Sequence, residues 1–368
     1  MDVIYGSRDY NIVAKCNYNT NINKKEKDAL YIERVTKSYS DNLLDSLKIE
    51  EQKDATKESD MPITNIGFLP NSFYRSDPLN RLLISSSNSL NLLHYSEESN
   101  ELTDILNLTL LKYNKNNTAT SNSNSFPPIT SFDFNITNNT DVIQSCIDTT
   151  CTVYDLTKQK IKTQLIAHDD LVLDVKYLNN NNTKKNAELF MTCGNDGSLR
   201  LFDLRTLDHS SILYEDSEKR PLLGLEVNPL DSNKILCFAL NSKQLAYIDL
   251  RFEKNPLKKI SINSNITSCL WLNNGLDFLT GDNNNVIAHW NINNLKTVEK
   301  PNNFFIDEDE SQTNENVIYN PKTEVSKNNS NNNTEGGKGI YKMRYIKEDN
   351  LINYLDYNNN LKITSFSL

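Results

Sequence analysis

Apolar residues along this chain fall in short runs of five to eight residues, rich in Val, Ile, Leu, Phe and Tyr. Asn, Asp, Gly or Ser bound the runs, and none shows the period of about 3.6 residues of an amphipathic helix. Runs of this length and composition predict β-strands, and their number predicts an all-β protein. They are PITSFDFN, DVIQSCID, CTVYDL, VLDVKYL, ELFMTCG, LRLFDLR, LLGLEVN, KILCFAL, QLAYIDL, ITSCLWL, LDFLTGD and VIAHWNI.

Four of these runs end in an aromatic or aliphatic residue followed by Asp or Asn, at a regular interval. The intervals are 48, 46 and 42 residues, between the pairs Tyr154-Asp155, Phe202-Asp203, Ile248-Asp249 and Trp290-Asn291. A period of roughly 40 to 45 residues is typical of four-stranded propeller blades. Each unit also has the order that a blade needs: a first strand, a second strand, a turn, and the strand that carries the pair.

Weaker copies outside this core bring the number of units to seven. LLISSSNSLNLLHY at 82–95 has the outline of a unit, and the runs IYKMRYI and LINYLDYNNNLKITSF near the end supply three strands. Residues 1 to about 60 fit a divergent first unit, with ALYIERV and DNLLDSLKI as strands. We therefore predict one seven-bladed β-propeller over residues 1–368.

Asparagine-rich polar tracts at 112–125, 179–186 and 306–338 interrupt the units. Such composition cannot bury enough apolar surface to offset the entropy of ordering the chain, so we expect loops. The last tract contains DEDESQTNEN and is expected to be a disordered acidic insertion within the propeller.

Charge and composition exclude several classes of function. The net charge of -9 and the pI near 5.1 argue against direct binding of nucleic acid, which needs a clustered excess of Lys and Arg. No basic segment followed by an apolar one opens the chain, and no run approaches the roughly 18 apolar residues of a membrane span. We expect a soluble protein of the cytoplasm and nucleus that makes no membrane contact.

Chemistry-bearing motifs are sparse. Six cysteines are scattered along the chain, and only Cys146 and Cys151 lie close together, so we interpret them as buried apolar residues on strands. The chain has no nucleophile elbow, no phosphate-cradling Gly loop and no His-Glu-X-X-His motif. We expect no enzymatic activity, no metal and no cofactor.

The units resemble WD40 blades, whose strands are pinned by hydrogen bonds among a His, a Ser or Thr, an Asp and a Trp. In the fourth unit His168, Thr192 and Asp196 fill the first three positions, and Phe202 takes the fourth. Because Phe has no N–H, we expect this relay to stop one member short. We interpret His168 as a structural pin rather than a catalytic base.

Two other units keep different parts of the relay, so the WD motifs are degenerate. The sixth unit has Thr280 and Trp290, but Asn284 takes the Asp place and no His precedes the unit. The third unit keeps Asp148, while Tyr and Gln replace its Trp and Ser. We expect blades that are held more by apolar packing than by polar relays.

The segment at 127–251 resembles the Transparent Testa Glabra family of anthocyanin-regulator WD40 proteins, known in animals as cullin-four-associated factor seven. The resemblance rests on IDTTC at 147–151, TQLIAHD at 163–169, and LDHS followed by YED within 207–216. It implies a non-enzymatic seven-bladed scaffold for dual-specificity tyrosine-regulated kinases or for transcription regulators. The polyasparagine habit suggests a fungal or similarly biased genome.

The scaffold role predicts a monomeric propeller that acts within protein complexes. We expect a partner to bind the segment from His209 to Arg220, with Tyr214, Glu215 and Asp216 as contacts. The same segment is also compatible with an interblade strand followed by a turn, and both interpretations remain open.

A second hypothesis is a substrate receptor of a cullin-RING ubiquitin ligase. Receptors of this class use Asp-X-Arg boxes on consecutive blades to bind the adaptor of the ligase. Asp203-Leu204-Arg205 and Asp249-Leu250-Arg251 occupy those places. The simpler interpretation, which we favour, is that each Arg pairs locally with its Asp. A third hypothesis is a generic WD40 adaptor in trafficking or RNA processing.

Overall fold

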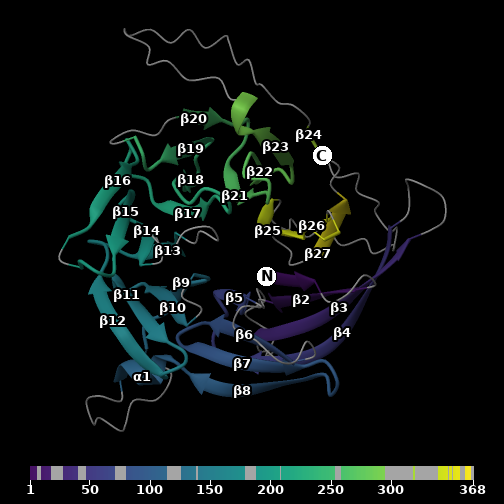
Figure 1. The fold of residues 1–368 in the computed structure, drawn as a ribbon. Helices are drawn as coiled ribbons and strands as arrows, with labels where there is room; N and C mark the ends of the chain where they lie inside the picture. Colours follow the sequence, from purple (N-terminus) through teal and green to yellow (C-terminus); the bar gives the residue numbers. More distant parts are fainter. Residues whose placement is uncertain are drawn as a thin grey trace, which may run out of the picture.

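Seven β-sheets surround a common axis in the computed structural model (Figure 1). This is the predicted all-β, seven-bladed propeller, which is thereby confirmed. The structure describes residues 1–5, 10–17, 28–39, 47–70, 80–113, 126–137, 140–178, 188–207, 209–252, 258–294, 318–319, 339–346, 348–349, 351–356 and 361–365.

The sheets follow one another in chain order, and we number them one to seven. Sheets one to three comprise β1 (Asp2–Tyr5), β2 (Tyr10–Asn17), β3 (Asp28–Tyr39) and β4 (Leu47–Ser59); β5 (Asn65–Phe68), β6 (Asn80–Ser86), β7 (Leu90–Ser96) and β8 (Glu101–Asn107); and β9 (Ile129–Phe134), β10 (Asp141–Cys146), β11 (Thr150–Asp155) and β12 (Lys160–Ile166). A short helix, α1 (Thr109–Tyr113), follows sheet two and contacts β12.

Sheets four to seven continue the pattern with antiparallel neighbours. They comprise β13 (Val172–Tyr177), β14 (Leu189–Gly194), β15 (Ser198–Asp203) and β16 (Ser211–Glu215); β17 (Leu222–Val227), β18 (Lys234–Ala239), β19 (Gln244–Asp249) and β20 (Lys258–Ser261); β21 (Ile266–Trp271), β22 (Asp277–Asp282), β23 (Ile287–Asn291) and β24 (Ile318–Tyr319); and β25 (Ile340–Ile346), β26 (Leu351–Asp356) and β27 (Leu361–Ser365).

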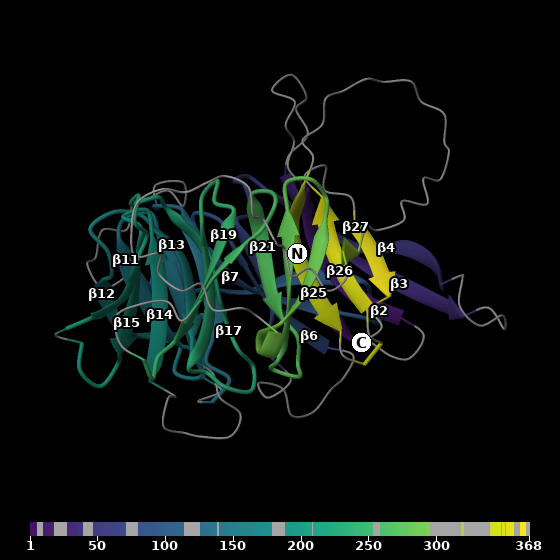
Figure 2. The same ribbon diagram turned by 90° about the horizontal axis from the view of Figure 1, so that it is seen from above.

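The first strand of each sheet lies nearest the axis, and each of these inner strands contacts the inner strands of both neighbouring sheets. β25 of sheet seven contacts β1 of sheet one, so the ring closes between the first and last described sheets. The side view in Figure 2 shows the sheets edge-on around the ring. We call the end at which the inner strands begin the first face, and the opposite end the second face.

Aromatic side chains stack in the same way in the sheet that lacks the relay Trp and in the one that keeps it. Phe202 stacks on Phe190 with ring centroids 5.1 Å apart and an interplanar angle of 8°. Trp290 stacks on Phe278 in the equivalent place of sheet six, at 6.3 Å and 11°. Phe202 is buried like Trp290, so its ring supplies apolar contact where its lack of an N–H removes a hydrogen bond.

Carboxylates on inner strands join neighbouring sheets near the axis. Asp2 accepts a hydrogen bond from the backbone N–H of Phe68 at 2.8 Å, linking sheets one and two. Asp133 accepts one from Tyr177 at 2.7 Å, linking sheets three and four. Asp174 of sheet four accepts one from Leu225 of sheet five at 3.1 Å.

Some boundaries differ from the sequence predictions. Residues 41–46 of the predicted strand DNLLDSLKI lie outside the described residues, and β4 begins at Leu47. Within the tract at 306–338, which the sequence predicts to be a disordered insertion, Ile318–Tyr319 forms β24, which pairs with β23. The rest of that tract lies outside the described residues.

All six cysteines are buried on strands, as expected from the sequence. The side chains of Cys193 and Cys237 belong to the apolar core between sheets four and five. Among the helices of the described residues, none is long and apolar enough to cross a membrane.

Candidate functional site

The most connected polar cluster of the first face lies in sheet four, around His168. His168 precedes β13, Thr192 lies on β14, and Asp196 lies in the turn between β14 and β15. The imidazole Nδ1 lies 3.0 Å from Asp196 Oδ2, and Nε2 lies 2.8 Å from Thr192 Oγ1. The structure therefore brings together the three side chains that the sequence singled out. His168 is only 1% exposed.

Burial decides the charge of this cluster. It lowers the pKa of His168, although the hydrogen bond and charge of Asp196 partly oppose the change. The imidazole is therefore neutral near pH 7, with Nδ1–H donating to Asp196 and Nε2 accepting from the Thr192 hydroxyl. Burial also disfavours ionised Asp196, but hydrogen bonds from Ser198 and His168 outweigh it and lower the pKa of that carboxyl.

Sequence reasoning missed two further members of the cluster. Ser198 Oγ donates to Asp196 Oδ1 at 2.7 Å. Arg200 Nη2 donates to Asp196 Oδ2 at 3.0 Å and to Asp169 Oδ2 at 2.7 Å. The relay lacks its Trp, as expected, but it continues outward through Arg200 instead of stopping. The signal was available, because Ser198 and Arg200 follow Asp196 at alternate positions and so share one face of β15.

The cluster contains Ser, His and Asp, but it is not arranged for nucleophilic catalysis. Ser198 lies on the Nδ1 side of the imidazole, which Asp196 also occupies, and Nε2 is taken by Thr192. A serine nucleophile needs a base whose other nitrogen is held by the carboxylate, and it needs access to substrate. The geometry is that of a pin between strands.

Sheet six holds its turn with a carboxylate that lies outside the Asp place of the alignment. Trp290 Nε1 donates to Thr280 Oγ1 at 2.9 Å. The turn is held not by Asn284 but by Asp282, whose Oδ1 accepts from the backbone N–H groups of Asn284 and Val286, both at 2.8 Å. Ser264 donates to the other oxygen of Asp282. Asn284 thus stands at the Asp place of the alignment, while Asp282, two residues earlier, holds the turn.

In sheet three, Asp148 holds its own turn. Its Oδ1 accepts from the backbone N–H of Thr150 at 3.2 Å and from the Thr150 hydroxyl at 2.6 Å. Lys112 at the end of α1 lies 3.4 Å from Oδ2. Burial opposes ionisation of Asp148, but these hydrogen bonds and the lysine charge lower its pKa.

Both Asp-X-Arg boxes form local ion pairs on the second face. Arg205 Nε donates to Asp203 Oδ1 at 2.8 Å, and its Nη2 donates to Oδ2 at 2.6 Å. Arg251 Nε donates to Asp249 Oδ1 at 2.8 Å, its Nη2 donates to Oδ2, and it also lies 3.4 Å from Asp231. Hydrogen bonds from the arginines are the main cause of the lowered pKa of Asp203 and Asp249.

These arginines are also accessible. The side chains of Arg205 and Arg251 are 61% and 54% exposed, on consecutive sheets and on the same face. Pairing with an Asp uses one edge of each guanidinium and leaves the rest open to solvent. The geometry thus contains the local pairing that the sequence favours, together with a surface that another protein could reach.

The segment from His209 to Arg220 is not a single loop. Residues Ser211–Glu215 form β16, the outer strand of sheet four, so His209 lies toward the second face and Asp216 at the first. Asp216 is buried and accepts from Arg220 Nε at 2.9 Å and Nη2 at 3.1 Å. The carboxylate of Asp216, which the sequence predicts to contact a partner, is therefore engaged by Arg220 within the protein. His209 and Glu215 are exposed, and Tyr214 is half-buried.

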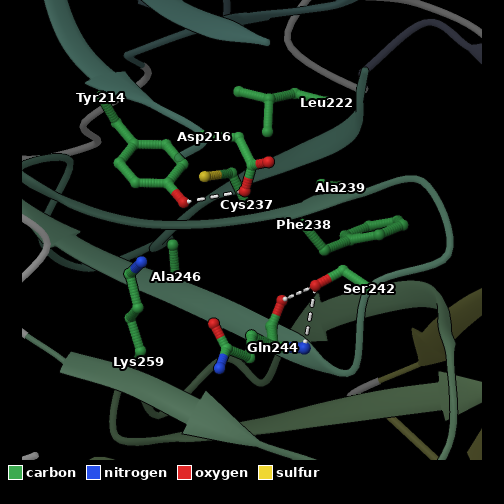
Figure 3. Close-up of a pocket in the computed structure, with 10 residues that line it drawn as sticks. All are labelled: Tyr214, Asp216, Leu222, Cys237, Phe238, Ala239, Ser242, Gln244, Ala246 and Lys259. Carbon is green, nitrogen blue, oxygen red and sulfur yellow. Dashed lines mark hydrogen bonds between the residues drawn. The ribbon is translucent and has the colours of Figure 1, made fainter. Parts of the chain in front are cut away.

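A small cavity lies beneath this part of the first face (Figure 3). Tyr214 and Asp216 border it from sheet four, and Cys237, Gln244 and Lys259 border it from sheet five. Its volume is about 10 Å³, roughly enough for one water molecule. It is too small for an organic ligand. No group of three or more His, Cys, Asp or Glu side chains within the described residues could hold a metal ion.

Comparison with known proteins places these features in a wider group. The chain is 37% identical over 221 residues to the WD repeat-containing protein YPL247C of Saccharomyces cerevisiae, covering 53% of this chain and 40% of that protein. It is 39% identical over 133 residues to the DDB1- and CUL4-associated factor 7 homolog of Dictyostelium discoideum, covering 36% and 39%. The chain is related to WD repeat proteins.

A third WD repeat relative is an uncharacterized protein of Schizosaccharomyces pombe, 42% identical over 140 residues, which are 34% of this chain and 31% of that protein. The chain thus spans less than half the length of each of these curated relatives. No protein-family model matches it. Phe202 in place of the relay Trp in sheet four, and Asp282 in place of an Asp at position 284 in sheet six, show how its WD repeats depart from the four-residue relay.

Proposed function

We propose that this protein is a non-enzymatic scaffold that holds regulatory proteins, either kinases of the dual-specificity tyrosine-regulated type or transcription regulators. The observation that carries the proposal is its 39% identity to a DDB1- and CUL4-associated factor 7 homolog on a seven-bladed propeller. The sequence resemblance to the Transparent Testa Glabra family points to the same role.

The polar clusters support a scaffold rather than an enzyme. His168, the histidine of the best-connected cluster, has both ring nitrogens engaged by buried protein groups. A propeller offers rigid faces with short, protected strand edges, which suits it to presenting surfaces to other proteins. Among the residues expected to contact a partner, His209 and Glu215 are exposed, at opposite ends of β16.

Affinity purification of the tagged full chain, followed by mass spectrometry, tests this proposal. We expect kinases or transcription regulators to be enriched over a purification with the tag alone. A variant with His209→Ala and Glu215→Ala tests whether β16 contributes, because neither side chain is needed for packing. Enrichment of neither class by the wild-type chain would count decisively against the scaffold role.

The second candidate function is a substrate receptor of a cullin-RING ubiquitin ligase. It is favoured by the exposure of Arg205 and Arg251 on consecutive sheets of the second face. The name of the Dictyostelium relative, which refers to DDB1 and CUL4, is consistent with it. Generic adaptor roles in trafficking or RNA processing have no specific observation in their favour.

Substituting both arginines distinguishes the receptor role from simple turn closure. We expect Arg205→Ala with Arg251→Ala to abolish co-purification of the ligase adaptor, and circular dichroism checks that the fold is kept. The buried carboxylate of Asp249 loses the Arg251 side chain in this variant but keeps the backbone N–H of residue 251 as a donor. Lys158→Ala with Lys160→Ala, which removes the same charge from sheet three, is the control. Unchanged adaptor binding by the arginine variant would mean that the Asp-X-Arg boxes serve only as local ion pairs at the strand ends.

A further inference from the structure

A hollow on the first face above sheet five lies between two turns and an outer strand. One wall is the turn at 217–220 that follows β16, and another is the turn at 241–244 between β18 and β19. Lys259 of β20 closes a third side. The hollow lies next to the cavity of Figure 3, with which it shares Ser242, Gln244 and Lys259.

The charge of this hollow is opposite to that of the whole protein. Its lining has three basic side chains, Arg220, Lys243 and Lys259, and one acidic side chain, Glu218. The chain as a whole has a net charge of -9. Arg220 is paired with Asp216 and Glu218. Within the part of the chain that the structure describes, Lys243 and Lys259 have no ion-pair partner.

The walls are shaped without a ligand. Asp216 holds Arg220 through the side chain and also accepts from its backbone N–H at 3.1 Å. In the opposite turn, Ser242 Oγ accepts from the backbone N–H of Gln244 at 3.0 Å. Lys219 and Asn241 have positive φ angles of 56° and 53°, so both turns are tight. A fixed arrangement of charges reduces the entropy lost when an oppositely charged partner binds.

An exposed apolar side chain lies next to the hollow in the sequence. Leu240 is 41% exposed and directly precedes Asn241, a residue of the lining. The backbone N–H of Leu240 donates to the carbonyl of Pro221 at 2.8 Å, which brings the two turns together beside the hollow. Lysines without an ion-pair partner beside an exposed leucine suit a peptide that carries both acidic and apolar side chains.

We propose that this hollow binds an acidic segment of a protein partner, with its carboxylates paired by Lys243 and Lys259 and an apolar side chain on Leu240. The guanidinium of Arg220 is already engaged by Asp216, so the hollow offers point charges rather than the open fork that favours phosphate. The inference rests on the proposed scaffold role and specifies the chemistry of one partner segment.

Fluorescence anisotropy with a short labelled peptide of alternating Glu and Leu, titrated with the full chain, tests the inference. We expect the peptide to bind, with affinity that falls as salt is added. Replacing its Glu by Gln removes binding. Lys243→Gln with Lys259→Gln weakens binding roughly tenfold. Lys158→Gln with Lys160→Gln, which changes the net charge equally on sheet three, leaves it unchanged, and circular dichroism shows that both variants are folded.

Absence of peptide binding overturns the inference, and so do three other outcomes. These are equal affinity for the Glu and Gln peptides, an equal loss in the control variant, and binding that occurs only after DEDE at 307–310 is neutralised to NQNQ. The last outcome would make the chain's own acidic tract the occupant. Enrichment of regulators by the wild-type chain without peptide binding removes this inference but leaves the scaffold role. Peptide binding without enrichment of regulators keeps the acidic-peptide site but removes the scaffold role.

Discussion

The imidazole of His168 occupies the space that a side chain on Gly194 would need, since a β-carbon built there lies 2.6 Å from Nδ1. The glycine and the histidine are therefore one feature of sheet four. In sheet six the residue in the same register as Gly194 is Asp282, and Ser264 donates to it instead of a histidine. In sheet four a residue without a side chain leaves room for a histidine, and in sheet six a larger residue, Asp282, is paired with the smaller Ser264.

This relationship predicts strong coupling between the two positions. We expect Gly194→Ala to destabilise the protein by about 1–3 kcal/mol, because the added methyl clashes with the buried ring. With His168→Ala already present, the ring is gone and the methyl has room, so the second change has a smaller effect. Urea unfolding of the two single variants and the double variant measures the coupling, and strictly additive effects would contradict it.

Trp290→Phe tests the hydrogen bond that sheet four lacks. The change removes the donor to Thr280 while keeping a ring that sheet four accommodates at the equivalent position, Phe202. We expect a loss of about 1–3 kcal/mol from the hydrogen bond and the lost volume together. Thermal unfolding measures the loss. In a Thr280→Val background the same substitution should cost less, and an equal cost there would mean that packing alone matters.

Stability below neutral pH should depend on His168. Burial lowers the pKa of His168 below its ordinary value of 6.5. Between the two values the unfolded chain binds more protons, so this group's contribution is full above pH 6.5 and is lost as the pH falls toward the folded-state pKa. We expect His168→Gln to flatten the fall in stability between pH 7 and pH 5, as measured by urea unfolding.

Asp133 acts in the opposite direction in the same range, because burial raises its pKa to about 6. Its contribution is present in both proteins and cancels when the wild type and His168→Gln are compared. Parallel pH profiles for the two proteins would argue against a neutral, buried imidazole.

Asp216 and Glu215 are neighbours whose replacement by Ala should affect stability to very different extents. Asp216→Ala leaves Arg220 and the turn at 217–220 without their buried acceptor, and we expect a loss of about 2–4 kcal/mol. Glu215→Ala removes an exposed side chain and should change stability by less than about 1 kcal/mol. Chemical unfolding separates the two, and a mild effect of Asp216→Ala would return that residue to the candidates for partner contact.

The repeat pattern made the fold predictable, because each sheet carries its own period of short apolar runs. The composition of the relay in sheet four was likewise predictable from His168, Thr192 and Asp196. Local spacing does not say which side chain meets which donor across a turn, so it showed Asn284 at the Asp place but not the role of Asp282. The alternation of Ser198 and Arg200 along β15 could have indicated Arg200, whereas its bonds to Ala167 and Asp169, which follow β12, do not show in local spacing.

Partner-facing residues were harder to predict than structural ones. A strand and a loop of five residues can share a composition, and β16 became recognisable only through its pairing with β15. Burial separates Asp216 from Glu215, and no sequence pattern distinguishes the two carboxylates. The basic hollow arises from residues on three separate segments, Arg220, Lys243 and Lys259, which come together only in the folded sheets.

β25 and β1 meet at the junction between the first and last described sheets of the ring, and here, as at the other junctions, no strand in the described part of the chain is shared between the two sheets. An ion pair between Arg344 Nε and Asp2, 2.9 Å apart, is one of the contacts that fasten it. Sheets one and seven can therefore separate at this junction without breaking the backbone hydrogen bonds within either sheet. Backbone amides of β1 and β25 should exchange hydrogen before those of β13 and β17, and mechanical or thermal unfolding should begin at this junction.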